Sequence, residues 1–497
     1  MSQDSLKQKT IKGVTWSAVD NVASYAVTFV VGIILARLLA PDDYGLIGII
    51  TIFTAICQCF INAGFGSALI RKKDATEDDY STVFVCNLIM SILLYLVLFF
   101  TSPLIASFFH RWELVALIRV ETLGMIITSF AIVQRTQLSK KIDFRSQAIV
   151  TFVSCVLRSI VGLTMAFTGF GVWAIIGQSI SGAIITTLLL CFFNKWMPCL
   201  RFSMSSFREL FGFGSKLLVS DIINTVWTQC YNVVIGRFYQ PSTLGQYTRA
   251  TMFSGLLSNN MTNVVQRVTY PILSEMQDDK VRLKSGYRRI IRVTMLVSFF
   301  CMLMMAAVAK PMIIVLIGPK WIEASYYLQI VCFSAMLYPL HSINLNILQV
   351  FGRSDLFLKL EIYKKTIAVV PIVFGITMGI YWMLIGSVAV SFISYYINAY
   401  YSGPLLNYSI SSQIRDIMPS FLISLIGAVT AYIIYLLIQY FFNSNNGFLP
   451  NLAIFLVMAT VGGTVSLLLF KYTKNPEYLE VVAILTGFKN KFFKKAN

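Results

Sequence analysis

Long apolar stretches separated by short polar segments are the main feature of the sequence. A helix needs about 20 apolar residues to cross about 30 Å of hydrocarbon. Fourteen stretches are long enough, with approximate limits 13–38, 44–66, 82–108, 114–134, 147–168, 171–193, 213–238, 243–266, 293–317, 323–349, 357–381, 383–403, 417–441 and 450–470. The runs are continuous and do not alternate with polar residues, which disfavours a membrane β-barrel. The pattern therefore predicts an all-α polytopic membrane protein with about 14 transmembrane helices.

Composition supports this class and narrows the possible functions. The chain has 497 residues, of which 57% are hydrophobic and 12% charged, and its mean hydropathy is +0.73. This charged share is about half that of an average soluble protein. The segments between the apolar stretches are short and contain no GxxxxGK[ST] run, so we expect neither a soluble catalytic domain nor an ATP motor. The first stretch is too long for a signal peptide, and we expect no cleavage.

The distribution of basic residues predicts the orientation. The net charge is +18, and with a cytoplasmic N-terminus the cytoplasmic segments hold 29 of the 40 Lys and Arg residues. The opposite side holds 5, and 6 lie within the membrane. The positive-inside rule therefore predicts a multi-pass membrane protein with both termini in the cytoplasm. The Lys- and Phe-rich tail is typical either of a segment attracted to anionic lipid or of a solvated tail.

An internal repeat divides the chain. The sequence GIILARLLAPDDYG at 32–45 aligns without a gap with NVVIGRFYQPSTLG at 232–245, and both join two apolar stretches on the external side. Six spans separate the two hairpins, so the halves enter the membrane from the same side and form a parallel repeat. We predict six-helix bundles at 1–200 and 201–405, two further helices at 406–471 and a basic cytoplasmic tail at 472–497.

Charged and amide residues inside the predicted spans are candidate functional groups, because polar side chains at bilayer depth need a cavity or a partner. The predicted spans contain six basic residues and only four acidic ones, Asp20, Glu121, Asp221 and Glu361. We therefore expect a cationic cavity that binds an anion. Asn259, Asn263 and Gln266 share one helix face. Glu361 and Lys365 are four residues apart and are also compatible with mutual neutralisation. The predicted substrate-binding residues are Arg158, Lys216, Arg249, Asn259, Asn263, Gln266, Arg119 and Lys364.

Ion coupling has two candidates, Asp20 and Asp221, at almost equivalent positions of the repeat. Either carboxylate could carry H⁺ or Na⁺, and membrane potential alone could also move a charged substrate. Eight of the nine cysteines lie in apolar stretches and the chain has only two histidines, so we expect no metal site and no cofactor.

Four segments resemble Wzx-type polysaccharide flippases of the multidrug/oligosaccharidyl-lipid/polysaccharide exporter superfamily. They are LARLLAPDDYGLIGIITIFTAICQCFINAGFGSALIRKKD (35–74), QLSKKIDFRSQAIV (137–150), GFGVWAIIGQ (169–178) and PILSEMQDD (271–279). The resemblance implies a V-shaped pair of six-helix bundles in the bacterial cytoplasmic (inner) membrane. It also implies alternating-access transport of undecaprenyl-pyrophosphate-linked oligosaccharide to the outer leaflet, for capsule, O-antigen or exopolysaccharide assembly. The implied protein is not an enzyme, and its partners are the lipid-linked glycan and the bilayer. A polysaccharide polymerase and glycosyltransferases are further possible partners, and we expect no nucleic-acid partner.

Three other functions remain open at this stage. A peptidoglycan lipid-precursor flippase has the same fourteen-span plan and a cationic lumen, and a multidrug exporter of the same superfamily favours an acidic cavity. A membrane-embedded glycosyltransferase or polysaccharide polymerase is the alternative from another class. Asp42 and Asp43 superficially resemble the acidic pair of such transferases, but their position after Pro41 is typical of a hairpin, and Ser242 and Thr243 replace them in the repeat.

Overall fold

The computed structural model of the chain describes residues 23–62, 64–442 and 447–493. Within these residues the regular structure is helical throughout, without a strand. Ten helical stretches are long and apolar enough to cross a membrane, and Ala23–Leu38 is a shorter apolar helix. The prediction of an all-α, multi-pass membrane protein is confirmed, and the number of fourteen spans stays a prediction.

The chain forms two compact units, which we call unit 1 (Met1–Gly245) and unit 2 (Gln246–Asn497). The predicted boundaries at residues 200, 405 and 471 follow the sequence repeat and stay predictions. In unit 1 the helix Ala23–Leu38 is followed by α2 (Pro41–Asn62), α3 (Phe65–Arg71), α4 (Glu77–Phe109), α5 (Glu113–Glu121), α6 (Leu123–Lys140), α7 (Phe144–Phe167), α8 (Trp173–Asn194), α9 (Met204–Phe238) and the first turn of α10 (Pro241–Glu275).

Side chains at the helix starts explain several of these boundaries. Thr76 and Asp79 form a capping box in which each accepts a hydrogen bond from the other residue's backbone N–H at the start of α4. Asp143 caps α7 and Ser203 caps α9, because each side chain accepts a hydrogen bond from a backbone N–H in the first turn of its helix. The helix α9 begins at Met204, nine residues before the apolar stretch that starts at 213, because its polar first turns are also helical. Hydropathy detects the part of a helix that lies in hydrocarbon, not the whole helix.

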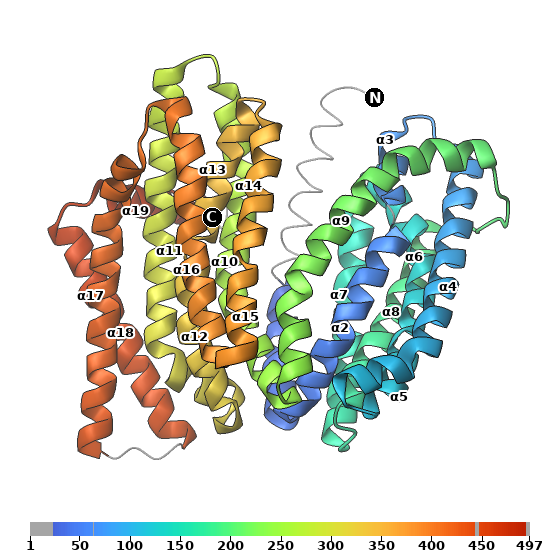
Figure 1. Cartoon of the computed structure of the whole chain (residues 1–497), viewed down its shortest axis with the longest axis horizontal. Helices are drawn as coiled ribbons and strands as arrows, with labels where there is room; N and C mark the ends of the chain where they lie inside the picture. Colours follow the sequence, from blue (N-terminus) through green and yellow to red (C-terminus); the bar gives the residue numbers. More distant parts are fainter. Residues whose placement is uncertain (1–22, 63, 443–446, 494–497) are drawn as a thin grey trace. The chain divides into compact units, whose positions relative to one another are not determined.

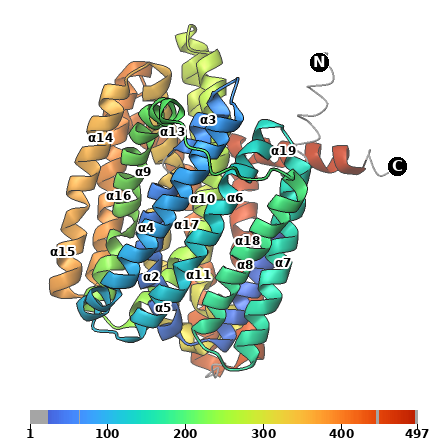
Figure 2. The same cartoon turned by 90° about the vertical axis from the view of Figure 1, so that its right-hand side faces the viewer.

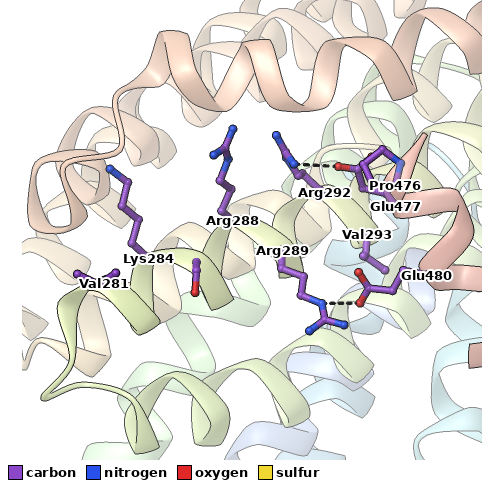
Figure 3. A pocket seen from close by; sticks show the side chains of 10 residues that line it. Val281, Lys284, Arg288, Arg289, Arg292, Val293, Pro476, Glu477 and Glu480 are labelled. Carbon is purple, nitrogen blue, oxygen red and sulfur yellow. Dashed lines mark hydrogen bonds and ion pairs between the residues drawn. The ribbon is translucent and has the colours of Figure 1, made fainter. Parts of the chain in front are cut away.

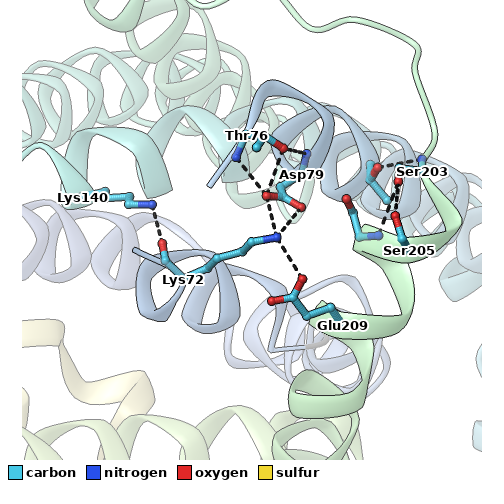
Figure 4. Close-up of polar contacts among 9 residues, drawn as sticks. Lys72, Thr76, Asp79, Lys140, Ser203, Ser205 and Glu209 are labelled. Atoms are coloured by element: carbon cyan, nitrogen blue, oxygen red, sulfur yellow. Dashed lines mark hydrogen bonds and ion pairs between the residues drawn. The ribbon is translucent and has the colours of Figure 1, made fainter. Parts of the chain in front are cut away.

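A small ionic cluster fixes the α3–α4 connection against α9 (Figure 4). The Lys72 ammonium lies 2.9 Å from a carboxylate oxygen of Asp79 and 2.9 Å from one of Glu209. The hydrogen bonds to Asp79 and then to Glu209 raise the pKa of Lys72 above its ordinary value. Lys140 on α6 donates to the Lys72 carbonyl, so the cluster joins four helices of unit 1.

The two copies of the repeated hairpin have the same local structure. The helix Ala23–Leu38 and α9 (ending at Phe238) stop at equivalent positions, and Pro41 and Pro241 begin the next helices. A β-carbon on Gly45 would lie 1.8 Å from the Pro241 carbonyl oxygen, and one on Gly245 would lie 2.0 Å from the Pro41 carbonyl oxygen. This reciprocal contact resembles an interface with twofold symmetry, and it explains why both copies have glycine there.

Unit 2 contains the rest of α10 and the following elements in chain order. They are α11 (Lys280–Ile317), η1 (Pro319–Trp321), α12 (Ile322–Ala335), α13 (Tyr338–Val350), α14 (Ser354–Ile367), α15 (Val369–Met378), α16 (Ile380–Ser402), η2 (Gly403–Leu406), α17 (Ile410–Phe442), α18 (Phe448–Tyr472) and α19 (Pro476–Phe493) (Figure 1). The helix α19 runs across the direction of the long helices of this unit (Figure 2).

The helix α11 forms the core of unit 2, because it packs against α12, α13, α17, α18 and α19. In the most apolar part of α11, 67% of the residues are buried, compared with 22% in the most apolar part of α18. The predicted span 323–349 is two helices, α12 and α13, separated at Met336 and Leu337. Pro339 explains the interruption: it has no N–H to donate to the Ala335 carbonyl, and its ring disfavours a continuous helix.

Candidate functional site

A polar pocket of about 740 Å³ lies within unit 1, among α2, α3, α6, α8 and α9. Seven of its sixteen lining residues carry a hydroxyl or an amide, and Arg135 and Asp221 are its two charged groups. The polar lining residues are Gln58, Asn62, Ser67, Thr128, Arg135, Thr136, Ser139, Thr186 and Asp221. Such side chains can bind a polar ligand through directional hydrogen bonds, which a purely apolar pocket cannot provide.

A break between α2 and α3 shapes one wall of this pocket. Gly64 has φ 67°, a left-handed conformation that glycine adopts without a steric penalty. A β-carbon on Gly64 would lie 2.8 Å from the Gly214 Cα and carbonyl oxygen, so these two glycines allow α3 to approach α9 closely. Gly64 and Gly66 both line the pocket and leave its wall without side chains there.

Arg135 is the cation of the pocket, and it is not among the binding residues predicted from the sequence. Its side chain is exposed, and within the described residues no hydrogen bond or ion pair is found for its guanidinium. The apolar stretch ends at 134, which placed Arg135 among the cytoplasmic bases, but α6 continues to Lys140. The signal was periodicity: Thr128, Ile132, Arg135 and Ser139 have the spacing of one helix face and all line the pocket.

The predicted residues of unit 1 lie in different surroundings. Asp221 lines the pocket and is exposed, while Lys216 is exposed on the same helix but outside the lining. Arg119 is fixed to α4: its Nε donates to the Phe99 carbonyl (3.3 Å) and to Ser102 Oγ (3.1 Å), and its guanidinium lies 4.1 Å from the Phe99 ring centroid. These contacts give Arg119 a helix-docking role in this structure.

Arg158 lies between α7 and α8. Its Nη2 atom is 4.0 Å from Cys155 Sγ, and its Nε is buried with no partner found among the described residues. A β-carbon on Gly182 would lie 2.9 Å from the Arg158 Cδ, so the glycine makes room for the side chain. Asp20, the second coupling candidate, lies outside the described residues.

The predicted residues of unit 2 form two separate groups. Asn259, Asn263 and Gln266 are exposed on α10, as their common helix face predicts, and Arg249 donates to Met252 Sδ at 3.0 Å. Lys364 on α14 forms an ion pair with Glu361, with 13% of the Lys364 side chain exposed. The neutralising partner of Glu361 is thus Lys364, three residues along, and not Lys365. The binding roles predicted for this set stay predictions.

A second pocket, of about 360 Å³, lies where α11 meets α19 (Figure 3). Arg289 and Arg292 on α11 form ion pairs with Glu480 and Glu477 on α19, at 2.6 and 3.2 Å. Arg288 and Arg292 also pair with Asp416 on α17, whose side chain is only 5% exposed. Arg288, Arg289 and Arg292 therefore hold α17 and α19 against α11.

The family is shown by a match to the family model described as "Polysaccharide biosynthesis protein", which covers residues 34–326, more than half of the chain. The chain belongs to this polysaccharide biosynthesis family. The predicted kinship with polysaccharide-transport proteins is thereby confirmed. The matched region runs from the helix Ala23–Leu38 into α12, so it includes the whole unit-1 pocket.

Curated relatives of this family resemble the chain over most of its length. The teichuronic acid biosynthesis protein TuaB of Bacillus subtilis (strain 168) is 24% identical over 88% of this chain and 91% of its own. The lipopolysaccharide biosynthesis protein WzxC of Escherichia coli (strain K12) is 24% identical over 86% and 88%. Among solved structures, the lipid II flippase MurJ in an inward closed conformation has a TM-score of 0.71 at 16% identity, covering 94% of this chain and 100% of that one. The likeness to MurJ shows the fold.

Proposed function

We propose that the protein is a flippase that moves undecaprenyl-pyrophosphate-linked oligosaccharide repeat units across the cytoplasmic membrane for the assembly of a surface polysaccharide. The unit-1 pocket is the observation that carries this proposal. Its hydroxyl and amide side chains match the hydrogen-bonding groups of sugars, and Arg135 provides a planar fork of donors for phosphate oxygens. Membership of the polysaccharide biosynthesis family and the names of the relatives support the same substrate class.

The proposed mechanism is alternating access with both termini in the cytoplasm. A pocket of about 740 Å³ is in the usual range for a small-ligand site, so it would hold the pyrophosphate and the first sugars, and not the whole lipid. The polyprenyl tail would stay in the bilayer, where its burial costs nothing. Asp221, on the wall of the same pocket, is placed to exchange an ion with the substrate region, and H⁺ or Na⁺ remains the proposed coupling ion.

Depletion of the protein tests the proposal. Lipid-linked glycan should accumulate on the cytoplasmic face of the membrane, which is measured with a membrane-impermeant sugar-modifying reagent applied to oriented vesicles. Accumulation of unpolymerised units on the external face would instead identify a polymerase and overturn the proposal. Accumulation of the peptidoglycan lipid precursor would identify the alternative cargo, a cell-wall precursor.

A further inference from the structure

The two charged side chains of the unit-1 pocket lie at different depths, where depth means distance from the ionic cluster of Lys72. Arg135 on α6 and Asp221 on α9 both line the pocket and are exposed, and no ion pair joins them within the described residues. Both helices meet at the ionic cluster, so positions along each helix give the depth of each group. The resulting order of the charges limits which ligand the pocket can hold.

The ionic cluster provides one reference level for α6 and α9 (Figure 4). Lys140 on α6 donates to the Lys72 carbonyl, and the Lys72 ammonium pairs with Glu209 on α9. From this level, Arg135 is five residues along α6 from Lys140, whereas Asp221 is twelve residues along α9 from Glu209. At about 1.5 Å per residue, the backbone of Asp221 therefore lies about 10 Å deeper than that of Arg135.

The packing of the α2–α3 break gives the same order. A β-carbon on Gly64 would lie 2.8 Å from the Gly214 Cα, and one on Gly66 would lie 3.5 Å from Thr136 Oγ1. The segment 64–66 thus sets Gly214 on α9 near the level of Thr136 on α6, the neighbour of the pocket arginine. Asp221 is seven residues beyond Gly214, which again corresponds to about 10 Å along the helix.

The deep end of the pocket has neutral hydrogen-bonding groups beside the carboxylate. Thr128 is twelve residues along α6 from the ionic cluster, so it lies at the level of Asp221. Cys59 Sγ on α2 lies 3.1 Å from Thr225 Oγ1 on α9, one turn beyond Asp221. This contact places the adjacent Gln58, which lines the pocket, at the same end. An amide, a hydroxyl and a carboxylate therefore line the deep end.

This arrangement fits a ligand with an anion at one end and hydroxyl or amino groups at the other. A carboxylate accepts hydrogen bonds and donates none, so Asp221 can bind adjacent sugar hydroxyls or an ammonium group. A ligand carboxylate at the same place would meet a like charge, which opposes binding. Among the described residues that line the pocket, Arg135 is the one base, and at about 10 Å it is too far away to offset this repulsion.

We propose that Asp221 determines sugar specificity: it selects glycans whose first sugar is neutral or carries an amino group, and it excludes a uronic acid at that position. This inference rests on the proposed function, because it takes Arg135 as the partner of the pyrophosphate. It assigns Asp221 a contact with the sugar in addition to the ion exchange proposed above. A binding ratio between two sugars reports the contact even where loss of ion exchange slows transport.

Ligand binding to the purified full-length protein in detergent tests the proposal without a transport step. Three short-chain polyprenyl pyrophosphates that differ only in their first sugar, which is glucosamine, glucose or glucuronic acid, are titrated by calorimetry. The wild type should bind the glucuronic acid compound at least about 10-fold more weakly than the glucose compound, because of the like charges. It should bind the glucosamine compound at least as tightly as the glucose compound. Equal or tighter binding of the glucuronic acid compound would overturn the proposal.

Variants at both ends of the pocket separate sugar specificity from pyrophosphate binding. Asp221→Asn keeps the size of the side chain and removes its charge, so the preference for glucose over glucuronic acid should disappear. Asp78→Asn removes an exposed carboxylate of α4 outside the pocket lining and is the matched control, which should keep the wild-type preference. Arg135→Gln should weaken the binding of all three compounds alike. An unchanged preference in Asp221→Asn would overturn the specificity role, whereas a wild type that binds none of the compounds would overturn the proposed function.

Discussion

Polar side chains in unit 1 and unit 2 are arranged in different ways. In the unit-1 pocket, Arg135 and Asp221 are exposed, and no ion pair is found for either among the described residues. In unit 2, Lys364 is paired, Asn344 and Asn398 are fully buried, and the arginines at the start of α11 are paired with carboxylates of α17 and α19. A charge without a protein partner is available to a ligand, whereas a paired charge mainly connects helices. Unit 1 therefore has the surface suited to ligand binding, and unit 2 has the interior suited to cohesion.

The largest effect is expected from Asp416→Ala. Asp416 accepts hydrogen bonds from Arg288, Arg292 and Tyr408, so its loss leaves the buried Tyr408 hydroxyl and two partly exposed arginines without their acceptor. Arg288 and Arg292 are 47% and 28% exposed, so water replaces part of their lost interaction. We therefore expect the free energy of unfolding to fall by about 2–3 kcal/mol. Denaturant unfolding in detergent measures it. Asp221→Ala in unit 1 is the matched control and should change stability by less than about 0.5 kcal/mol. Equal losses in both variants would remove the distinction between the units.

Arg135→Ala should reverse this pattern, with little change in stability and a large loss of transport. A hydrogen bond from a charged donor contributes about 1.5–3 kcal/mol, which corresponds to about 10- to 100-fold in the flipping rate. Arg135→Lys should restore only part of the rate, because an ammonium cannot form the bidentate contact. Arg208→Ala removes an exposed arginine near the start of α9 and is the control, which should flip lipid-linked glycan at the wild-type rate. Wild-type flipping by Arg135→Ala would contradict the assignment of the pocket.

A smaller effect is expected from Tyr287→Phe in the core of unit 2. The Tyr287 hydroxyl is buried and donates to Asn344 Oδ1. In the variant, Asn344 Oδ1 would keep only its 3.5 Å contact with Ser402 Oγ. The expected loss is about 1 kcal/mol, measured by the midpoint of thermal unfolding. Thr186→Val, which removes a hydroxyl from the unit-1 pocket wall, is the comparison and should be close to neutral. A larger loss from Thr186→Val than from Tyr287→Phe would be the opposite of the expected result.

The smallest effect is expected from Lys72→Gln, about 0.5 kcal/mol, because its two ion pairs are partly exposed. Folding raises the pKa of Lys72. Its contribution to stability is therefore complete below the pKa of the unfolded chain, near 10.5, and is lost only as the pH rises through the pKa of the folded protein. The difference between Lys72→Gln and the wild type should therefore be constant from about pH 6 to 8. It should decrease with added salt. A marked pH dependence in that range would show that another group is involved.

Several features of the site were predictable from periodicity, and others were not. The amide face of α10 and the polar position of Asp221 follow from helical spacing, and the structure leaves these residues exposed. Arg135 has the same kind of spacing signal, but hydropathy ended the predicted span one residue before it. The roles of Arg119, which binds α4, and of Lys364, which pairs with Glu361, depend on helix packing and rotamer choice. Sequence spacing allows Glu361 to pair with Lys364 or Lys365, three and four residues along, and it contains no information on the partner of Arg119.

By itself, the sequence determined the helical membrane class and the repeated hairpin, because both are local properties. A helix in hydrocarbon must satisfy its own backbone and be apolar for about 20 residues, and a hairpin needs its proline and glycine at fixed positions. The tertiary structure decided which polar groups face a pocket and which are paired. These contacts join residues 50 or more positions apart, such as His341 with Ser391 and Arg292 with Asp416, and only the packing of helices brings them together.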